Sequence, residues 1–225
     1  MFSVLFEVQP KSDRWDLYLE YAKVLKPELE AIEGFVDNIR YRSLTREGWL
    51  LSLSNWRDEK SLVRWRTQAK HHAVQQKGRA EVFLDYHLRV GQLTHDTGLP
   101  EGQVLHEQRL DATEVGAATT VTLLDAERPA ARVAASQPIE LAAGLGLRSE
   151  ASGLIAWDVF EAVLTPGAVI SLMSWRDQAA AEAFERTTAL DAGVRRRRIR
   201  VVRDYGMFDR REAPQYYAAV ARRRG

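Results

Sequence analysis

Hydrophobic and polar positions follow the same order twice along the chain. In the first pass, a strand rich in aromatic and β-branched residues is followed by helical spacing, which starts near Ser12 or Asp13 and ends at Gly34. The first pass predicts strands at 2–8, 35–44, 49–54 and 81–90, with helices at about 12–33, 58–65 and 69–78. This order is that of a β-α-β-β-α-β module.

The second pass is less regular but keeps the same order. It predicts strands near 119–124, 154–163, 168–174 and 197–207, an Ala-rich distorted helix near 130–143 and a helix from Asp177. Residues 94–116 read as a linker, and residues 214–223 predict a short helix in the tail. We therefore divide the chain into a first module at 1–93, a linker at 94–116 and a diverged second module with its tail at 117–225.

Residue identities support this repeat at an offset of about 119. The segment 52–58 falls on 171–177, and both segments end in Trp-Arg-Asp. Further ungapped matches are Gly34 with Gly153, Gly48 with Gly167, Trp65 with Phe184, Arg79 with Arg198, and Asp85-Tyr86 with Asp204-Tyr205. Such a module leaves one face of its sheet bare, and two bare faces can cover each other. We therefore predict an α+β protein in which two fused ferredoxin-like modules form an intrachain dimeric α+β barrel.

Composition narrows the function classes. The formal net charge is +1, so no global charge attracts nucleic acid, and no run of 18 apolar residues indicates a membrane span. The absence of cysteine excludes disulfides, thiol nucleophiles and cysteine-ligated metals, and His71-His72 alone is not a metal motif. We expect a cytoplasmic protein that binds neither nucleic acid nor membrane nor metal.

The first module resembles the antibiotic biosynthesis monooxygenase family. The resemblance rests on Gly34-Phe35, 51–59, Trp65-Arg66, His71, Gln75, Gly78-Arg79, Phe83, Asp85-Tyr86 and 88–90. It covers residues 1–93 well, and the second module only through its Trp-Arg-Asp segment and a few later positions. The resemblance implies a dimeric α+β barrel and a monooxygenase that is either cofactor-free and quinone-forming or heme-degrading.

A cofactor-free oxygenase needs a proton acceptor, hydrogen-bond donors for a developing oxyanion and an apolar pocket. His71 is the candidate catalytic group, because an ordinary imidazole pKa near 6.5 suits proton transfer. Gln75 follows one turn later and could share its helix face. Arg79 could bind an oxyanion or carboxylate, although its recurrence as Arg198 favours a structural ion pair with Asp85.

Three further residues are candidates for substrate binding, each with a structural alternative. Trp65 could form a wall of the pocket. Tyr86 could donate a phenolic hydrogen bond, although its match to Tyr205 favours packing. Asn38 could place an amide over the sheet, although an exposed strand position is the simpler interpretation. The repeated Trp56 and Trp175 are expected in the core.

The modules are not chemically equivalent, because Leu190 stands where the repeat places His71. We therefore expect chemistry in the first module alone, with the second as a built-in partner in a monomeric pseudo-dimer or a homodimer. The leading hypothesis is a cofactor-free monooxygenase that uses O₂ on a small aromatic, phenolic, quinol or enolisable substrate. The first alternative is a heme-binding or heme-degrading protein with His71 as axial ligand, although Glu7 lies near where heme-degrading relatives carry asparagine. The second is a non-catalytic small-molecule-binding barrel.

Overall fold

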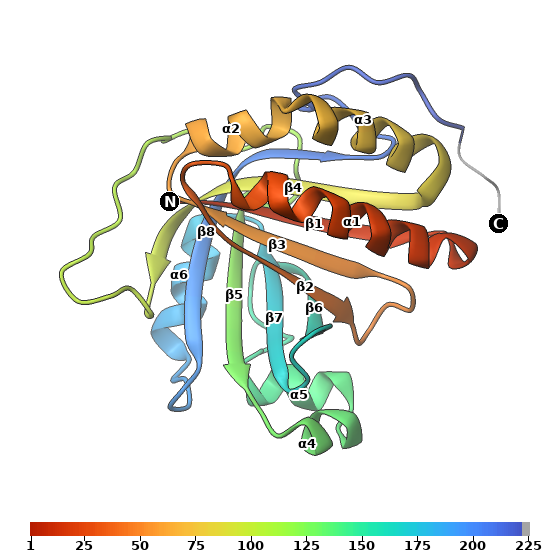
Figure 1. Cartoon of the computed structure of the whole chain (residues 1–225). Coiled ribbons are helices and arrows are strands. Elements are labelled where there is room, and N and C mark those ends of the chain that lie inside the picture. Colours follow the sequence, from red (N-terminus) through yellow and green to blue (C-terminus); the bar gives the residue numbers. More distant parts are fainter. Residues whose placement is uncertain (222–225) are drawn as a thin grey trace.

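The computed structural model describes residues 1–221 of the 225-residue chain. Its elements form two consecutive sets (Figure 1). The first set is β1 (Phe2–Pro10), the 3-10 turn η1 (Ser12–Arg14), α1 (Trp15–Glu30), β2 (Phe35–Ser43), β3 (Leu50–Trp56), α2 (Glu59–Thr67), α3 (Ala69–Lys77), the π-helical turn η2 (Gly78–Val82) and β4 (Phe83–Asp96). The second set is β5 (Thr120–Glu127), α4 (Ala130–Ala135), α5 (Pro138–Gly144), β6 (Leu154–Ala162), β7 (Ala168–Trp175), α6 (Gln178–Thr187) and β8 (Arg195–Gly206).

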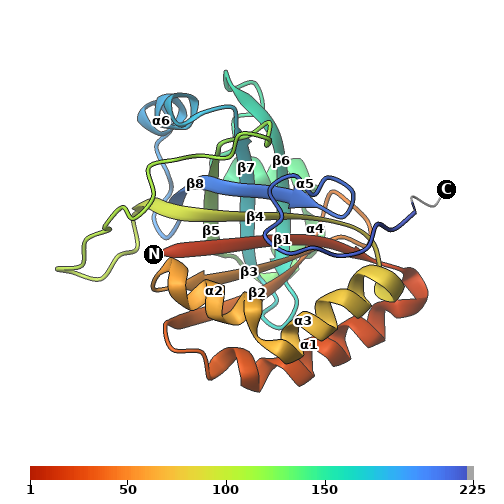
Figure 2. The same cartoon turned by 90° about the horizontal axis from the view of Figure 1, so that it is seen from above.

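The strands close into one antiparallel barrel in the order β1-β3-β2-β6-β7-β5-β8-β4. In each half, the first strand lies between the third and the fourth, as in a ferredoxin-like module. The two sheets meet where β2 pairs with β6 and where β4 pairs with β8. Helices α1, α2 and α3 lie outside the first sheet (Figure 2). The predicted fold of two fused ferredoxin-like modules in one intrachain α+β barrel is confirmed.

The barrel interior is filled by apolar side chains from all eight strands. They are Leu5, Tyr41, Leu51, Leu53, Leu93, Val121, Leu123, Phe160, Ala162, Ile170, Leu172, Ile199 and Val201. Because side chains alternate along a strand, the residues between them point outward to the helices. Each sheet therefore has one face in the barrel and one face under helices.

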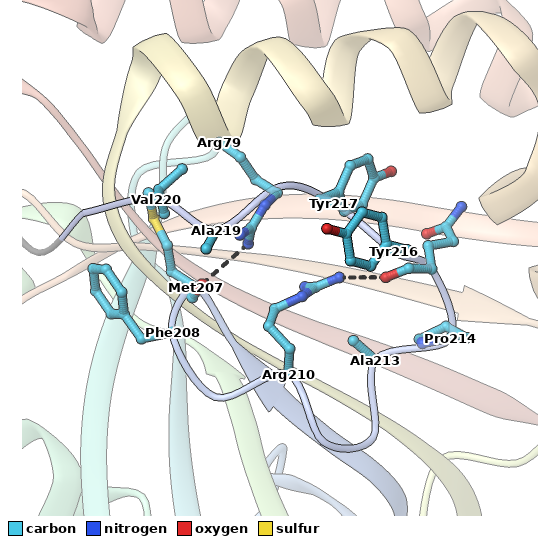
Figure 3. A pocket seen from close by; sticks show the side chains of 11 residues that line it. Arg79, Met207, Phe208, Arg210, Ala213, Pro214, Tyr216, Tyr217, Ala219 and Val220 are labelled. Carbon is cyan, nitrogen blue, oxygen red and sulfur yellow. Dashed lines mark hydrogen bonds between the residues drawn. The ribbon is translucent and has the colours of Figure 1, made fainter.

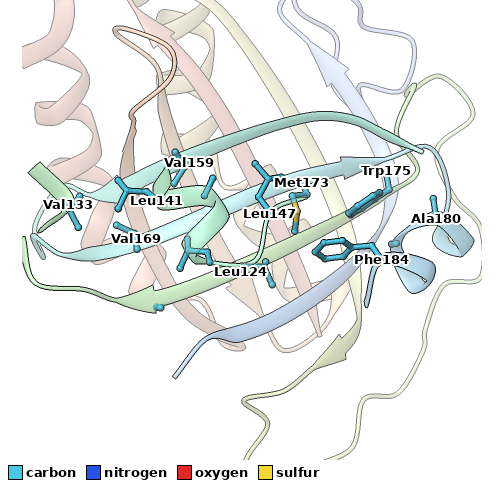
Figure 4. Packing of buried hydrophobic residues seen from close by; sticks show 14 residues of the cluster. Leu124, Val133, Leu141, Leu147, Val159, Val169, Met173, Trp175, Ala180 and Phe184 are labelled. Atoms are coloured by element: carbon cyan, nitrogen blue, oxygen red, sulfur yellow. The ribbon is translucent and has the colours of Figure 1, made fainter. Parts of the chain in front are cut away.

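The outer faces carry their own cores. Trp56 lies under α2 in the first module, and Trp175 packs against Phe184 of α6 in the second (Figure 4). Both indoles are fully buried, and each donates its N–H at 3.0 Å, Trp56 to Ser54 and Trp175 to Thr122. The expectation that the repeated tryptophans are core residues is confirmed.

The local structure around the repeated segment is also the same in both modules. Gly34 and Gly153 have φ of +88° and +82°, and a Cβ there would collide with a side chain of the following helix. Asp58 and Asp177 cap α2 and α6, each accepting a backbone N–H at 2.8 Å. These backbone requirements explain why the residues recur.

The repeat does not extend to the fourth strand, contrary to the ungapped alignment. In the first module, Phe2 of β1 pairs with Trp56 on one side and with Gln92 on the other. In the second module, Thr120 of β5 pairs in the same way with Trp175 and with Arg200. Gln92 therefore corresponds to Arg200, and the fourth strands are aligned about eleven residues differently from the sequence repeat. The matches of Arg79 with Arg198 and of Tyr86 with Tyr205 are not structural equivalences, so recurrence is no argument against a specific role for Arg79 or Tyr86.

The shift arises because the second module has no counterpart of α3. The chain passes from α6 to β8 through residues 188–194, which form no helix. The predicted tail helix is also wrong within the described residues, since 214–221 contain no helix, and the remaining positions 222 and 223 lie outside the described residues. Residues 207–221 instead run as an irregular tail beside α3 (Figure 1).

A buried ion network joins the two sheets inside the barrel. The carboxylate of Glu7 on β1 accepts hydrogen bonds from Arg89 Nη2 at 2.6 Å and from Arg46 Nη2 at 2.5 Å. Arg46 Nε donates to Asp158 of β6 at 2.8 Å. Burial alone would raise the pKa of Glu7, but Arg89 and Arg46 outweigh it and hold the pKa below 4.5. Glu7 is therefore the ionised counterion of two arginines.

The equivalence of the tryptophans gives a first prediction. Trp56→Ala and Trp175→Ala should each destabilise the protein by about 3–5 kcal/mol, because each leaves a large cavity and an unpaired hydroxyl. Chemical unfolding of the two variants measures this. A loss of less than about 1 kcal/mol at both positions would contradict the core assignment.

Replacing Glu7 gives a second prediction. Glu7→Gln leaves Arg89 without its buried counterion and should cost about 3–5 kcal/mol at neutral pH. The pKa of Glu7 is lower in the folded state than in the unfolded state. Its contribution to the free energy of unfolding is therefore present above about pH 4.5 and is lost as the pH falls through the pKa of the folded state. Urea unfolding at about pH 7 and about pH 3 should therefore show a difference between wild type and variant that shrinks in acid. Equal stabilities at neutral pH would refute this role of Glu7.

Candidate functional site

The turn between α2 and α3 fixes the positions of two predicted site residues, Trp65 and His71. Gln68 alone separates the helices, and its extended backbone ends α2. Its side-chain oxygen accepts the backbone N–H of His71 at 2.6 Å, and its amide group donates to Glu28 of α1 at 3.2 Å. The start of α3 is therefore tied to α1, and His71 is held in the first turn of α3.

His71 stacks on Trp65, with ring centroids 4.0 Å apart and planes at 14°. A carbonyl oxygen only accepts, so His71 Nδ1 donates to the Trp65 carbonyl at 2.9 Å and leaves Nε2 as the lone-pair nitrogen. Burial lowers the pKa of His71 to about 4, so the expected ordinary imidazole pKa is wrong. At neutral pH His71 is an uncharged base with a fixed tautomer.

A pocket of about 440 Å³ lies beside α3, under the C-terminal tail (Figure 3). Of its 11 lining residues, ten belong to the tail segment 207–220 and the other is Arg79. Its volume is in the range of small-molecule sites. The sequence analysis placed the pocket in the first module and missed the tail that forms most of it.

Arg79, Tyr86 and Arg210 meet at this pocket. Arg79 is 5% exposed, and its Nη1 donates to the Tyr86 phenol oxygen and, at 3.2 Å, to the Met207 carbonyl. Arg210 Nη1 donates to the same phenol oxygen at 2.6 Å. The expected ion pair between Arg79 and Asp85 is wrong, because no salt bridge joins Arg79 to any acidic residue within 1–221.

The tail is attached to α3 through Tyr217. Its hydroxyl donates to Gln75 Oε1 at 2.8 Å and lies 3.1 Å from His72 Nδ1, and its ring stacks on the His72 imidazole. His72 is therefore half-buried against the tail. Gln75 lies one turn after His71, so α3 links the His71–Trp65 pair to the wall of the pocket.

Asn38 is not brought to this pocket. It lies on β2, where its amide donates to Ser52 Oγ at 2.9 Å and to the Leu53 carbonyl at 3.3 Å. In the sheet, β2 is separated from β4 by β3 and β1, which corresponds to roughly 14 Å across the strands. The predicted site residues thus divide into a tail-side group of Gln75, Arg79 and Tyr86, a neighbouring pair of Trp65 and His71, and Asn38 apart from both.

The second module has a different hollow. It has a volume of about 600 Å³ and is lined by Thr97 and by residues between 185 and 196, including Leu190. Glu185 and Asp191 contribute acidic groups to its rim, and no helix equivalent to α3 borders it. Within residues 1–221, no group of three or more His, Cys, Asp or Glu side chains is placed to hold a metal ion. No helix of that same part of the chain is long and apolar enough to cross a membrane.

Comparison with known proteins assigns the chain to a family. The model of the antibiotic biosynthesis monooxygenase family matches residues 1–77. Jasmonate monooxygenase ABM from Pyricularia oryzae is 48% identical over 227 residues, which cover 96% of this chain and 98% of the relative. An aldoxime dehydratase crystallised with butyraldoxime shares the fold, with a TM-score of 0.56, 11% identity and coverage of 89% of this chain and 79% of the other. The chain therefore belongs to the antibiotic biosynthesis monooxygenase family.

The low pKa of His71 gives a third prediction. The folded protein keeps His71 neutral down to about pH 4, whereas the unfolded chain binds a proton near pH 6.5. The unfolded state therefore binds more protons in this interval, and stability should fall by up to about 3 kcal/mol as the pH drops through it. His71→Phe keeps an aromatic ring on Trp65 and removes this loss.

Unfolding at several pH values checks the prediction, with His106→Phe as the control because His106 is exposed. The control should follow the wild-type pH profile, and His71→Phe should be less sensitive to acid. Parallel profiles for all three proteins would show that His71 is not buried in its neutral form.

Proposed function

We propose that the protein is a cofactor-free monooxygenase that oxidises a small phenolic, quinol or enolisable molecule with O₂ in the pocket between the first module and the C-terminal tail. The observation that carries this proposal is the 48% identity, over nearly the whole length of both chains, with a jasmonate monooxygenase. The arrangement of His71, α3 and the tail supports it, because a base of fixed tautomer lies on the helix whose Gln75 contacts Tyr217 of the pocket wall.

The proposed chemistry starts with removal of an activated C–H or O–H proton by His71 Nε2. The electron-rich anion then reacts with O₂. In the case of an activated methylene group, one oxygen atom ends in a carbonyl group and the other leaves as water, so the substrate supplies all four electrons. A pKa of about 4 makes His71 a weak base, so this step needs a substrate whose proton is already activated, and the imidazolium then passes its proton on readily.

Trp65 and the tail supply the surroundings that this chemistry needs. The Trp65 indole covers one face of His71 and excludes water from it. Tyr217 and the apolar tail residues line the pocket, and Tyr217 attaches the tail to Gln75 of α3. Jasmonate is a cyclopentanone with a carboxylate side chain, so it belongs to the enolisable class and is the first substrate to test.

Oxygen uptake by the purified protein tests the proposal. Jasmonate and a panel of hydroquinones and anthrones should support O₂ consumption without added cofactor or reductant. His71→Phe should lower kcat about 100-fold or more, as for loss of a general base, while His106→Phe should not. The rate should stay level from about pH 8 to about pH 5, because His71 is neutral throughout this range.

The same sample separates the alternatives. A Soret band on titration with hemin, together with O₂ uptake that requires it, would replace this proposal by the heme alternative. Saturable ligand binding without O₂ uptake under either condition would indicate a non-catalytic binding barrel.

A further inference from the structure

The pocket contains two guanidinium groups with no acidic partner. Arg79 follows α3 in the first module and Arg210 lies in the C-terminal tail. Both donate to the same Tyr86 oxygen, so two positive charges lie close together. Among residues 1–221, neither guanidinium forms a salt bridge with a carboxylate. Two like charges at a half-enclosed site repel each other, and a bound anion would relieve this repulsion.

Uncharged tyrosine rings stabilise the two guanidinium groups only in part. Arg79 lies over the rings of Tyr86 and Tyr217, each at 5.6 Å, and Arg210 lies over Tyr205 and Tyr217, each at 5.4 Å. Although Arg79 is 5% exposed, its Nε has no hydrogen-bond partner. Within residues 1–221, the charge of Arg79 is therefore offset only by aromatic rings and neutral oxygen atoms.

The acidic residues of the tail are engaged elsewhere. Asp209 pairs with Arg211, the neighbour of Arg210 in the sequence. Glu212 accepts the Thr113 hydroxyl at 2.7 Å and the Asp204 backbone N–H at 2.6 Å. The tail thus brings both signs of charge to this region but leaves the positive pair in the pocket uncompensated.

We infer that Arg79 and Arg210 bind the carboxylate of a small monocarboxylic acid whose apolar body lies in the pocket under the C-terminal tail. Guanidinium groups suit this ligand because their planar N–H donors match a carboxylate. The other walls are largely apolar, with Met207, Phe208 and Val220 among them, and suit a hydrocarbon body (Figure 3). This inference rests on the proposed function, for which it specifies the substrate class and adds Arg210 as a specificity-determining residue.

The test compares an acid with its neutral ester in the absence of O₂, so that binding is measured without turnover. The probes are jasmonate and methyl jasmonate, titrated by calorimetry. Wild type should bind the acid at least about 10-fold more tightly than the ester, since the ester lacks the charge-assisted hydrogen bonds. Arg210→Met should weaken binding of the acid by about 10- to 100-fold and leave ester binding unchanged.

Arg211→Met is the matched control, because it removes the adjacent arginine, which is exposed and already paired with Asp209. It should bind both probes as wild type does. Arg79→Lys provides a second variant that keeps the buried charge but loses the planar donor group, and it should also weaken acid binding selectively. Circular dichroism of each variant verifies that the barrel is folded.

Equal binding of acid and ester by wild type, no saturable binding of the acid, or an unchanged acid affinity in folded Arg210→Met would each overturn the inference. These outcomes are distinct from failure of the proposed function. If the carboxylate site is absent but hydroquinones still support O₂ uptake, the monooxygenase proposal stands. If the acid binds through Arg210 without any O₂ uptake, the site stands and the monooxygenase proposal fails.

Discussion

Each four-stranded sheet has helices on one face only, and its other face is apolar. Burial of these two bare faces against each other is the constraint on which the rest of the structure depends. Leu5 and Leu53 of the first sheet share one core with Leu123 and Ile199 of the second. Pairing of β2 with β6 and of β4 with β8 removes the open sheet edges at the same time. Because the partner sheet is part of the same chain, this burial does not depend on protein concentration.

The barrel also explains why the pocket contains residues of both modules. β8 pairs with β4, and Gly206 at its end lies opposite His87. The Met207 backbone N–H donates to the Tyr86 carbonyl at 3.0 Å, so the tail leaves the second module directly beside the first. It then crosses to α3, where Tyr217 contacts Gln75. The first module alone could not supply Arg210, because this residue follows β8 of the second module.

Burial of the two sheets against each other requires the packing of the second module but not a helix equivalent to α3. Loss of an α3 counterpart removes the helix that carries His71 and Gln75 in the first module, yet Trp175 and Phe184 still fill the core under α6. The second module therefore contributes the opposite sheet and the tail. The two copies of one fold therefore share their core packing but differ in the helix that follows the repeated segment.

The strands, the two-module barrel and the buried tryptophans could be predicted from the sequence, because they depend on local requirements that recur at Gly34 and Asp58 and their counterparts. The register of β8 could not be predicted, because the ungapped alignment of the two modules ignored the missing α3 counterpart. It therefore placed Arg198 and Tyr205 at positions that they match only by chance. The irregular tail has no periodicity from which its course could be predicted. The low pKa of His71 depends on its burial, which arises only when the turn at Gln68 is folded and holds the imidazole against Trp65.

We propose that the pocket lined by Arg79 of the first module and by the tail of the second holds the substrate. A crystal structure of the protein with jasmonate, grown without O₂, tests this most directly. We expect ligand density under the tail, with the carboxylate between Arg79 and Arg210 and the apolar body along Met207 and Tyr217. Density in the hollow beside Leu190, or inside the barrel, would contradict it.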